Sequence, residues 1–541
     1  MQSQLLQVML ESADTTRRTF MKYDYVIVGA GSAGAILATR LSENPDINVL
    51  LLEAGPDYNG IEDLPEEVKY GYKSTTSIWD SQHNWQYKAT STTGNTIDVP
   101  RGKVTGGSSA INGTIFLRGI EEDYDDWAEA GNDQWGFQDL MPYFNKIETD
   151  KTYEDNPGDF HGSSGPIICV RYPEDTWLPG SRAFTDAALD AGFPFCEDAN
   201  APDTTGVGPL PLNSPDGIRW STAIGYLGLS RHRLNLTIRP NVLIKRVVFD
   251  LPADTPRATG VIAVSDGEEF TVEGDEIILT AGAIGTPQLL MLSGIGPQAH
   301  LKEFGIDCIK DVPGVGQNLA DHPLTQVTWK TKPHVELDPV GPRLQVLLRY
   351  TAEGSDIEND MIVYMQHAAS RARELGDSFI DPIGISAGLG LNLALSKGEL
   401  KLASADYRDP PVLNYNMLDD QEDMRRYRDG IRMLVSLENH PSMKDIIENR
   451  PYLLDSDLES DEALESWIKK NVGTGHHISC TAKMGPVTDP MAVTDQYGKV
   501  HGLAGLRLAD ASVMPECVRA NINVTVMVIG ERIADFIKQG H

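Results

Sequence analysis

The residues best suited to chemistry lie near opposite ends of the 541-residue chain. Residues 29–34 form the glycine loop GAGSAG, whose pattern G-x-G-x-x-G lets a phosphate group approach the backbone closely. Near the other end stand His476 and His477. Histidine suits proton abstraction because its unperturbed pKa lies close to working pH. These two regions are the first candidates for a nucleotide site and for a general base.

The elements around the glycine loop are those that such a loop needs. A β-branched run at 25–28 predicts a buried strand, residues 35–41 predict a helix, and residues 48–52 predict a second strand that ends at Glu53. The N-terminus of the helix offers unpaired N–H groups and a positive dipole to phosphates. Strand, glycine loop, helix, strand and acid in this order predict a dinucleotide site, without distinguishing FAD from NAD.

Each residue of this unit has an expected role. Gly29 makes the tight turn, Gly31 leaves room for a pyrophosphate, and Gly34 lets helix and strand approach. Glu53 accepts hydrogen bonds from the ribose hydroxyls. We therefore expect the cofactor to contact the residues Gly29, Gly31, Ser32, Ala33, Gly34 and Glu53.

Four blocks of sequence resemble the glucose–methanol–choline (GMC) family of oxidoreductases along residues 23–538. They are residues 23–55, residues 100–127 with the motif PRGKVTGGSSAING, residues 279–297 with LTAGAIGTPQLL, and the stretch from His476 onward. The resemblance implies FAD as the cofactor and an FAD-dependent oxidoreductase that oxidises an alcohol, with hydride transfer to flavin N5.

The resemblance also implies which residues contact the flavin. It places Val104, Gly107, Asn112, Gly113 and Ile115 along the isoalloxazine edge, although read alone the segment also fits a plain turn with Asn112 as a cap. Some family members attach FAD covalently through a histidine in this loop. Here Ile111 stands at that position, so we expect non-covalent FAD.

The remaining cofactor contacts come from three further places in the chain. Val242 matches the position that contacts adenine, although an ordinary core valine explains it nearly as well. Asp510 and Ala511 match positions that hold the pyrophosphate and ribityl chain, and His476 occupies a site where relatives carry an aromatic side chain facing the flavin.

The catalytic pair is expected to be His477 and Asn523. Residues 476–485, HHISCTAKMG, resemble the family pattern H-P-x-G-T-x-x-M-G with His477 as the base, although isoleucine and cysteine replace its proline and glycine. Asn523 matches a position that holds histidine or asparagine, and asparagine is typical of choline oxidase-like and hydroxymethylfurfural oxidase-like members. Asn523 also fits an N-cap of a helix over 524–538, whose dipole, together with Val524, would face the flavin N1 region.

The fold class that these elements imply is mixed α/β. We expect a Rossmann-like FAD-binding domain assembled from residues 1–165, 215–325 and 475–541. Residues 166–214 and 326–474 are expected to form a substrate domain on an antiparallel sheet flanked by helices. Strands in this second domain are predicted at 361–366, 383–393 and 399–403.

The substrate is expected to be a neutral primary alcohol. Choline oxidases carry a glutamate after the triplet D-H-P, whereas here Asp321-His322-Pro323 is followed by Leu324, which leaves a quaternary ammonium without its partner. Leu324, Trp329, Tyr364 and Met365 are candidates for an apolar pocket, with core packing the alternative for most of them. The alternative functions are a lyase or photodecarboxylase on the same scaffold and a flavoprotein without catalysis.

The composition limits the classes of partner and the cellular location to be expected. The net charge of -32 excludes nucleic acid as an expected partner, since phosphates would be repelled. No membrane span is evident, and the five scattered cysteines indicate neither a metal site nor a disulfide framework. Residues 16–22, TRRTFMK, look like a twin-arginine signal but run directly into the first strand, so we expect a cytoplasmic protein. The electron acceptor, oxygen or another, is left open, as is the oligomeric state.

Overall fold

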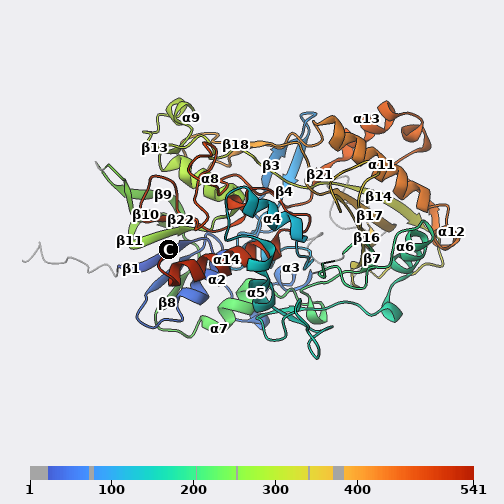
Figure 1. Ribbon diagram of the computed structural model, residues 1–541, viewed down its shortest axis with the longest axis horizontal. Coiled ribbons are helices and arrows are strands. Elements are labelled where there is room, and N and C mark those ends of the chain that lie inside the picture. The colour runs from blue at the N-terminus through green and yellow to red at the C-terminus, as the bar shows by residue number, and fades with distance from the viewer. Residues whose placement is uncertain (1–21, 72–77, 203, 252–253, 339–340, 370–382) are drawn as a thin grey trace, which may run out of the picture.

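The computed structural model describes residues 22–71, 78–202, 204–251, 254–338, 341–369 and 383–541. Apart from Lys22, the twin-arginine-like segment lies outside these residues. Two large sheets organise the molecule, one at the left of Figure 1 around β1 and one at the right around β16 and β17. Mixed α/β architecture is thus confirmed.

The first sheet contains the parallel strands that carry the glycine loop. Its order is β8-β2-β1-β11-β10-β9, with β22 also paired to β11. The strands are β1 (Tyr23–Val28), β2 (Val49–Leu52), β8 (Leu236–Arg239), β9 (Leu243–Asp250), β10 (Arg257–Ser265), β11 (Glu268–Leu279) and β22 (Leu506–Leu508). β10 pairs with both β9 and β11 in antiparallel fashion, and the other pairs of this sheet are parallel. The predicted strands at 25–28 and 48–52 correspond to β1 and β2.

Two helices from distant parts of the chain pack together beside this sheet. They are α2 (Ser32–Leu41) and α14 (Asn523–Lys538), which lie side by side in Figure 1. A Cβ at Gly530 would lie 3.0 Å from Ala33 Cα, so small residues permit this close approach. Glu531 of α14 is fully buried and accepts hydrogen bonds or ion pairs from Arg40, Lys146 and Tyr226. One carboxylate therefore ties α14 to three other segments.

The second large sheet is antiparallel, as expected. Its order is β20-β14-β17-β16-β15-β7, with β21 also paired to β14. The strands are β7 (Gly206–Pro209), β14 (Pro323–Thr331), β15 (Leu344–Tyr350), β16 (Met361–Ala369), β17 (Gly384–Leu391), β20 (Ile447–Asn449) and β21 (Gly473–Thr474). The helices around it are α6 (Pro179–Asp190), α11 (Gln421–Leu437), α12 (Pro441–Ile446) and α13 (Asp461–Asn471) (Figure 1).

The strand predicted at 399–403 exists but belongs to a different sheet. It is β18 (Glu399–Lys401), in a four-stranded sheet of order β18-β19-β3-β4 with β19 (Val412–Asn414), β3 (Tyr87–Thr90) and β4 (Thr96–Val99). Strand propensity is local, whereas the choice of pairing partner depends on contacts far along the chain, which explains the difference.

The remaining elements are short. Two-stranded sheets join β5 (Glu148–Asp150) to β6 (Ile167–Cys169) and β12 (Ile295–Gly296) to β13 (Lys310–Asp311). The other helices are α3 (Glu66–Lys69), α4 (Glu121–Glu129), α5 (Phe137–Ile147), α7 (Gly228–Ser230), α8 (Gly282–Leu292) and α9 (Gln298–Glu303). Among the described residues, none of the helices has the length and apolar character needed to span a bilayer.

Candidate active site

The glycine loop connects β1 to α2 and packs against a loop that follows β11. Gly29 has φ +106°, and a Cβ there would lie 2.6 Å from the Thr280 carbonyl oxygen. A Cβ at Gly34 would lie 2.0 Å from the carbonyl oxygen of Gly29. Gly31 differs, because the nearest atoms to its Cβ position are 3.9 Å away or more. The turn and the close packing therefore need Gly29 and Gly34, and Gly31 faces open space.

That open space is part of an elongated cavity of about 680 Å³. The cavity extends from the glycine loop and β2 to the residues around His477 and to the antiparallel sheet. Most of the residues predicted to bind cofactor or act in catalysis line it: Gly29, Gly31, Ser32, Ala33, Glu53, Gly107, Asn112, Gly113, Ile115, Val242, His476, His477, Asp510, Ala511 and Asn523.

Three predicted cofactor residues are not on this wall. Gly34 is enclosed by the glycine loop, as its contact with Gly29 requires. Val104 is fully buried in a small hydrophobic cluster with Val68 and Ile78, and Val524 is fully buried within α14. Gly34 has the packing role expected of it, and the flavin contacts that the resemblance implies for Val104 and Val524 stay predictions.

Two buried carboxylates hold the backbone at the nucleotide end of the cavity. Glu53 accepts hydrogen bonds from the backbone N–H groups of Ala30 and Gly55, both at 2.9 Å. Burial raises the pKa of Glu53 to about 7. Asp510 accepts hydrogen bonds from the Gly282 N–H at 2.9 Å and the Thr286 hydroxyl at 2.6 Å, and so fixes the start of α8. Burial likewise raises the pKa of Asp510.

At the other end of the cavity, His477 contacts an asparagine that differs from the predicted one. The Nδ2 of Asn521 lies 2.9 Å from His477 Nε2. The hydroxyl of Tyr364, on β16, donates to Asn521 Oδ1 at 2.7 Å. Tyr364 thereby fixes the orientation of the Asn521 amide, so that its NH₂ group points to the imidazole. The structure brings together His477, Asn521 and Tyr364, from three distant segments of the chain.

Asn523, the expected partner of His477, makes a different contact. Its Oδ1 accepts a hydrogen bond from the Ser32 hydroxyl at 2.7 Å, which links α14 to the glycine loop. It is not an N-cap, because α14 begins at Asn523 itself and Ile522 is the capping residue. The two asparagines are separated by one residue, and the start of the helix directs the second one toward α2 rather than toward His477.

Two residues that sequence reasoning left without a role hold His477 in place. Asp321 Oδ1 accepts hydrogen bonds from the backbone N–H groups of His322 at 2.7 Å and His477 at 2.9 Å. The Thr474 hydroxyl donates to the other oxygen of Asp321 at 2.5 Å. His322 Nδ1 lies 2.9 Å from His477 Nδ1. The triplet at 321–323 was the available signal, but nothing local indicated that its first two residues contact His477.

These contacts specify the tautomer of His477. An amide nitrogen only donates, so His477 Nε2 accepts from Asn521 and the ring proton of neutral His477 lies on Nδ1. His322 Nδ1 must then accept, which places the proton of His322 on Nε2. That nitrogen lies 3.2 Å from Cys517 Sγ, and the Val518 carbonyl also interacts with the ring. The network leaves the basic lone pair of His477 on the side of Asn521.

Both histidines are neutral at ordinary pH. Burial, followed by the neighbouring His322, His476 and Arg101, lowers the pKa of His477 well below its usual value. Burial lowers the pKa of His322 to about 4. Consequently His477 is unprotonated and able to accept a proton without first losing one.

The cavity fits a bound FAD in three respects. The backbones of Gly31 and Gly107 approach each other closely with no side chain between them, since a Cβ at Gly107 would lie 2.6 Å from Gly31 Cα. The start of α2 faces the same space, which suits a pyrophosphate. Farther along, Asn523 Nδ2 is buried without a hydrogen-bond partner, and Asn523 lines the cavity. A buried amide without a partner is what an absent acceptor group would explain.

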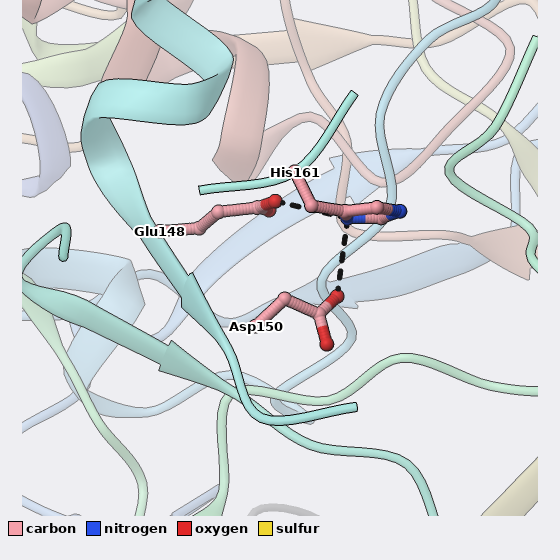
Figure 2. A group of neighbouring side chains, drawn as sticks. All are labelled: Glu148, Asp150 and His161. Carbon is pink, nitrogen blue, oxygen red and sulfur yellow. Dashed lines mark hydrogen bonds and ion pairs between the residues drawn. The ribbon is translucent and has the colours of Figure 1, made fainter. Parts of the chain in front are cut away.

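A second polar cluster, away from the cavity, has the residue types of a metal site. Figure 2 shows the ring of His161 between the carboxylates of Glu148 and Asp150. Its Nδ1 lies 3.1 Å from Glu148 and 3.4 Å from Asp150, and its Nε2 lies 2.8 Å from Asp198. Burial lowers the pKa of His161, but hydrogen bonds to Asp198 and Glu148 outweigh it and raise the value to about 9.

Two arginines complete the charge balance of this cluster. Arg118 pairs with Glu148 at 2.6 Å and Arg171 pairs with Asp150 at 2.6 Å. Two guanidinium groups and one imidazolium thus face three carboxylates. Because a protonated imidazole cannot ligate a metal, the cluster is an internal ion-pair network.

Comparison with known proteins agrees with the geometry of the cavity. Family models described as GMC oxidoreductase match residues 23–324 and residues 394–530. An oxygen-dependent choline dehydrogenase of Burkholderia lata is 36% identical, over 96% of this chain and 94% of the relative. Another, from Ectopseudomonas mendocina, is 34% identical over 96% and 94%.

Solved structures give the same answer. The crystal structure of pyridoxine 4-oxidase from Mesorbium loti superposes with a TM-score of 0.87 at 29% identity, covering 96% of this chain and all of that one. The family resemblance and the FAD cofactor expected from the sequence are therefore confirmed. The chain belongs to the GMC family, and it is an FAD-dependent oxidoreductase that acts on CH–OH donors.

Proposed function

We propose that this protein oxidises a neutral primary alcohol to the corresponding aldehyde, with His477 as the base that takes the hydroxyl proton. The observation that carries the proposal is the contact between His477 Nε2 and Asn521 Nδ2 in the cavity wall, 2.9 Å apart. FAD, when bound, supplies the acceptor for the hydride of the alcohol carbon. The residues of the chain supply the proton acceptor, the hydrogen bonds and the orientation.

The proton moves to a defined atom. The alcohol hydroxyl takes the place of Asn521 Nδ2 at the lone pair of His477 Nε2 and donates its proton there. Asn521 Nδ2 lies beside that lone pair and donates to the substrate oxygen as negative charge develops on it. Tyr364 holds the amide through Asn521 Oδ1. Asp321 and His322 hold the imidazole from behind, so the base is rigid before the substrate arrives.

The neutrality of the substrate is supported by the charges on the cavity wall. The described residues of the antiparallel sheet that line the cavity are Leu324, Leu344, Tyr364 and Gln366, and none of these is charged. Elsewhere the wall carries charges of both signs, from Arg101, Lys103, Arg408, Glu53, Asp409 and Asp510. A quaternary ammonium would meet no carboxylate from that sheet among the described residues. We therefore propose a neutral alcohol, although curated relatives carry the name choline dehydrogenase.

We also propose that FAD is held without a covalent bond. Ile111 lines the cavity at the position where a linking histidine would stand, and an aliphatic side chain offers no nucleophile. Denaturing the purified protein with acid and centrifuging it tests this. Flavin in the supernatant is expected, and flavin that remains with the pellet would contradict it.

The oxidation itself is tested by mixing the FAD-loaded protein anaerobically with primary alcohols, and with choline for comparison. We expect neutral alcohols to bleach the flavin absorbance and choline to do so at least tenfold more slowly. Faster bleaching by choline would refute the substrate class. Unchanged flavin with product formation would identify a lyase instead. Hydrogen peroxide produced under air would identify oxygen as the electron acceptor.

A further inference from the structure

The wall that the antiparallel sheet presents to the cavity contains polar side chains on an otherwise apolar surface. Tyr364 and Gln366, two residues apart on β16, both line the cavity. Gln326 on β14 and Tyr364 on β16 are each paired in register with Gly388 of β17. Because paired residues of neighbouring antiparallel strands project to the same face, Gln326 shares the face of Tyr364 and Gln366.

The amides of the two glutamines converge over Gly388. A Cβ at Gly388 would lie 3.4 Å from Gln326 Nε2 and 3.4 Å from Gln366 Nε2. The absence of a side chain at this position creates a notch between the two strands. Both amide nitrogens border that notch; Gln366 also lines the cavity, whereas Gln326 is adjacent to it across the notch and is not one of the lining residues.

The orientation of the Gln326 amide is fixed, and its nitrogen has no partner. The Ser386 hydroxyl donates to Gln326 Oε1 at 2.9 Å, so the oxygen is engaged and Nε2 is the free end. Gln326 Nε2 is buried without a hydrogen-bond acceptor. A buried N–H group left unsatisfied costs about 1–3 kcal/mol, and a ligand oxygen at the notch would remove that cost.

We propose that Gln326 and Gln366 form a subsite that hydrogen-bonds a second oxygen of the alcohol substrate. This inference rests on the proposed function and narrows its substrate to alcohols with a hydroxyl, ether or carbonyl oxygen at the end away from the reacting carbon. Two neutral amides match a neutral oxygen. They offer no charge to balance a carboxylate, and the net charge of -32 repels anions.

The position of the subsite sets the length of the substrate. Tyr364 supports Asn521 beside the base, and Gln366 lies two residues farther along the same face, which is about 7 Å along a strand. Leu324 and Leu344 provide apolar wall at the same end of the cavity. A benzene ring with oxygen-bearing groups at its para positions has about the length needed to reach from His477 to the amides.

The test compares two alcohols that differ by one oxygen-bearing arm. Benzyl alcohol and 4-(hydroxymethyl)benzyl alcohol are mixed anaerobically with the FAD-loaded wild type and with Gln326→Leu and Gln366→Leu. Met365→Leu is the matched control, because Met365, a pocket candidate from the sequence, has its buried side chain on the opposite face of the same strand, against Gly180 of α6 and away from the cavity. Dissociation constants are taken from the concentration dependence of flavin reduction.

We expect the wild type to bind the diol about tenfold more tightly than benzyl alcohol, the worth of one or two hydrogen bonds. Each leucine variant should weaken the diol about tenfold and change benzyl alcohol by about twofold or less, and the control should change neither. Equal binding of both alcohols by the wild type, or equal losses for both in the variants, would overturn the subsite. If no alcohol bleaches the flavin, the proposed oxidation is refuted and the subsite falls with it.

Discussion

Replacing His322 by leucine tests whether the tautomer of His477 matters. His322 does not line the cavity, and its one contact with the proposed chemistry is through His477 Nδ1, at 2.9 Å. Leucine removes the acceptor of the Nδ1 proton while keeping a side chain of similar bulk. The neutral ring of His477 is then more stable with its proton on Nε2. There the proton occupies the position of the lone pair that accepts the substrate proton.

The size of the effect follows from the burial of both rings. His322 is 3% exposed and His477 is 9% exposed, so water does not readily replace the lost acceptor. A buried N–H group without a partner costs about 1–3 kcal/mol, which corresponds to about 5- to 150-fold in an equilibrium. We expect flavin reduction in His322→Leu to slow by that factor, with little change in substrate binding.

Anaerobic stopped-flow reduction of the flavin measures the rate directly, and flavin absorbance reports whether the variant still binds FAD. His322→Asn is the matched control, because asparagine Oδ1 takes roughly the place of imidazole Nδ1 and should recover most of the rate. Wild-type reduction by His322→Leu with full FAD content would refute the reasoning. So would an asparagine variant as slow as the leucine variant.

Three further outcomes are expected. His477→Ala should slow flavin reduction by about 10²–10⁴-fold while FAD content is retained, and near-normal reduction would remove His477 from the role of base. Because the pKa of His477 is lowered, the reduction rate should stay level as pH falls from 9 through 6.5 and decline only in more acid solution, so a decline centred near neutrality would contradict the assignment. The pKa of His161 is raised to about 9, so the contribution of its charge to stability is complete below about pH 6.5 and is lost as pH rises through 9. Between those limits the melting temperature of the wild type should fall more than that of His161→Gln. Parallel melting profiles would count against the ion-pair network.

The sequence predicted most of what depends on local pattern. The strand and helix around the glycine loop, the role of Gly29 in the turn, and the second strand before Glu53 all follow from periodicity and from the demands of a phosphate site. The antiparallel sheet was also expected. The sheet membership of β18 was not, because pairing between strands far apart leaves no mark on either strand alone.

The surroundings of His477 were less predictable for the same reason. The His322–His477 contact spans 155 residues, and the Tyr364–Asn521 contact spans 157. Two asparagines separated by one residue look alike in a sequence, and only the point at which α14 begins separates their directions. The structure places Asn521 in contact with the base and Asn523 in contact with Ser32, and the part that Asn523 takes in catalysis stays a prediction.

The hydrogen bond between Ser32 and Asn523 has a consequence for how the protein is made, because its two ends are 491 residues apart. At about 5–20 residues per second, a ribosome needs roughly 25–100 s to travel between them. During that interval the glycine loop has been synthesised but lacks α14, Asn521 and His477. The cofactor can thus be enclosed only late in translation, and the unpaired apolar faces of the early strands are exposed to aggregation until then. Slow translation of this chain should therefore increase its dependence on chaperones during synthesis and leave the stability of the folded protein unchanged.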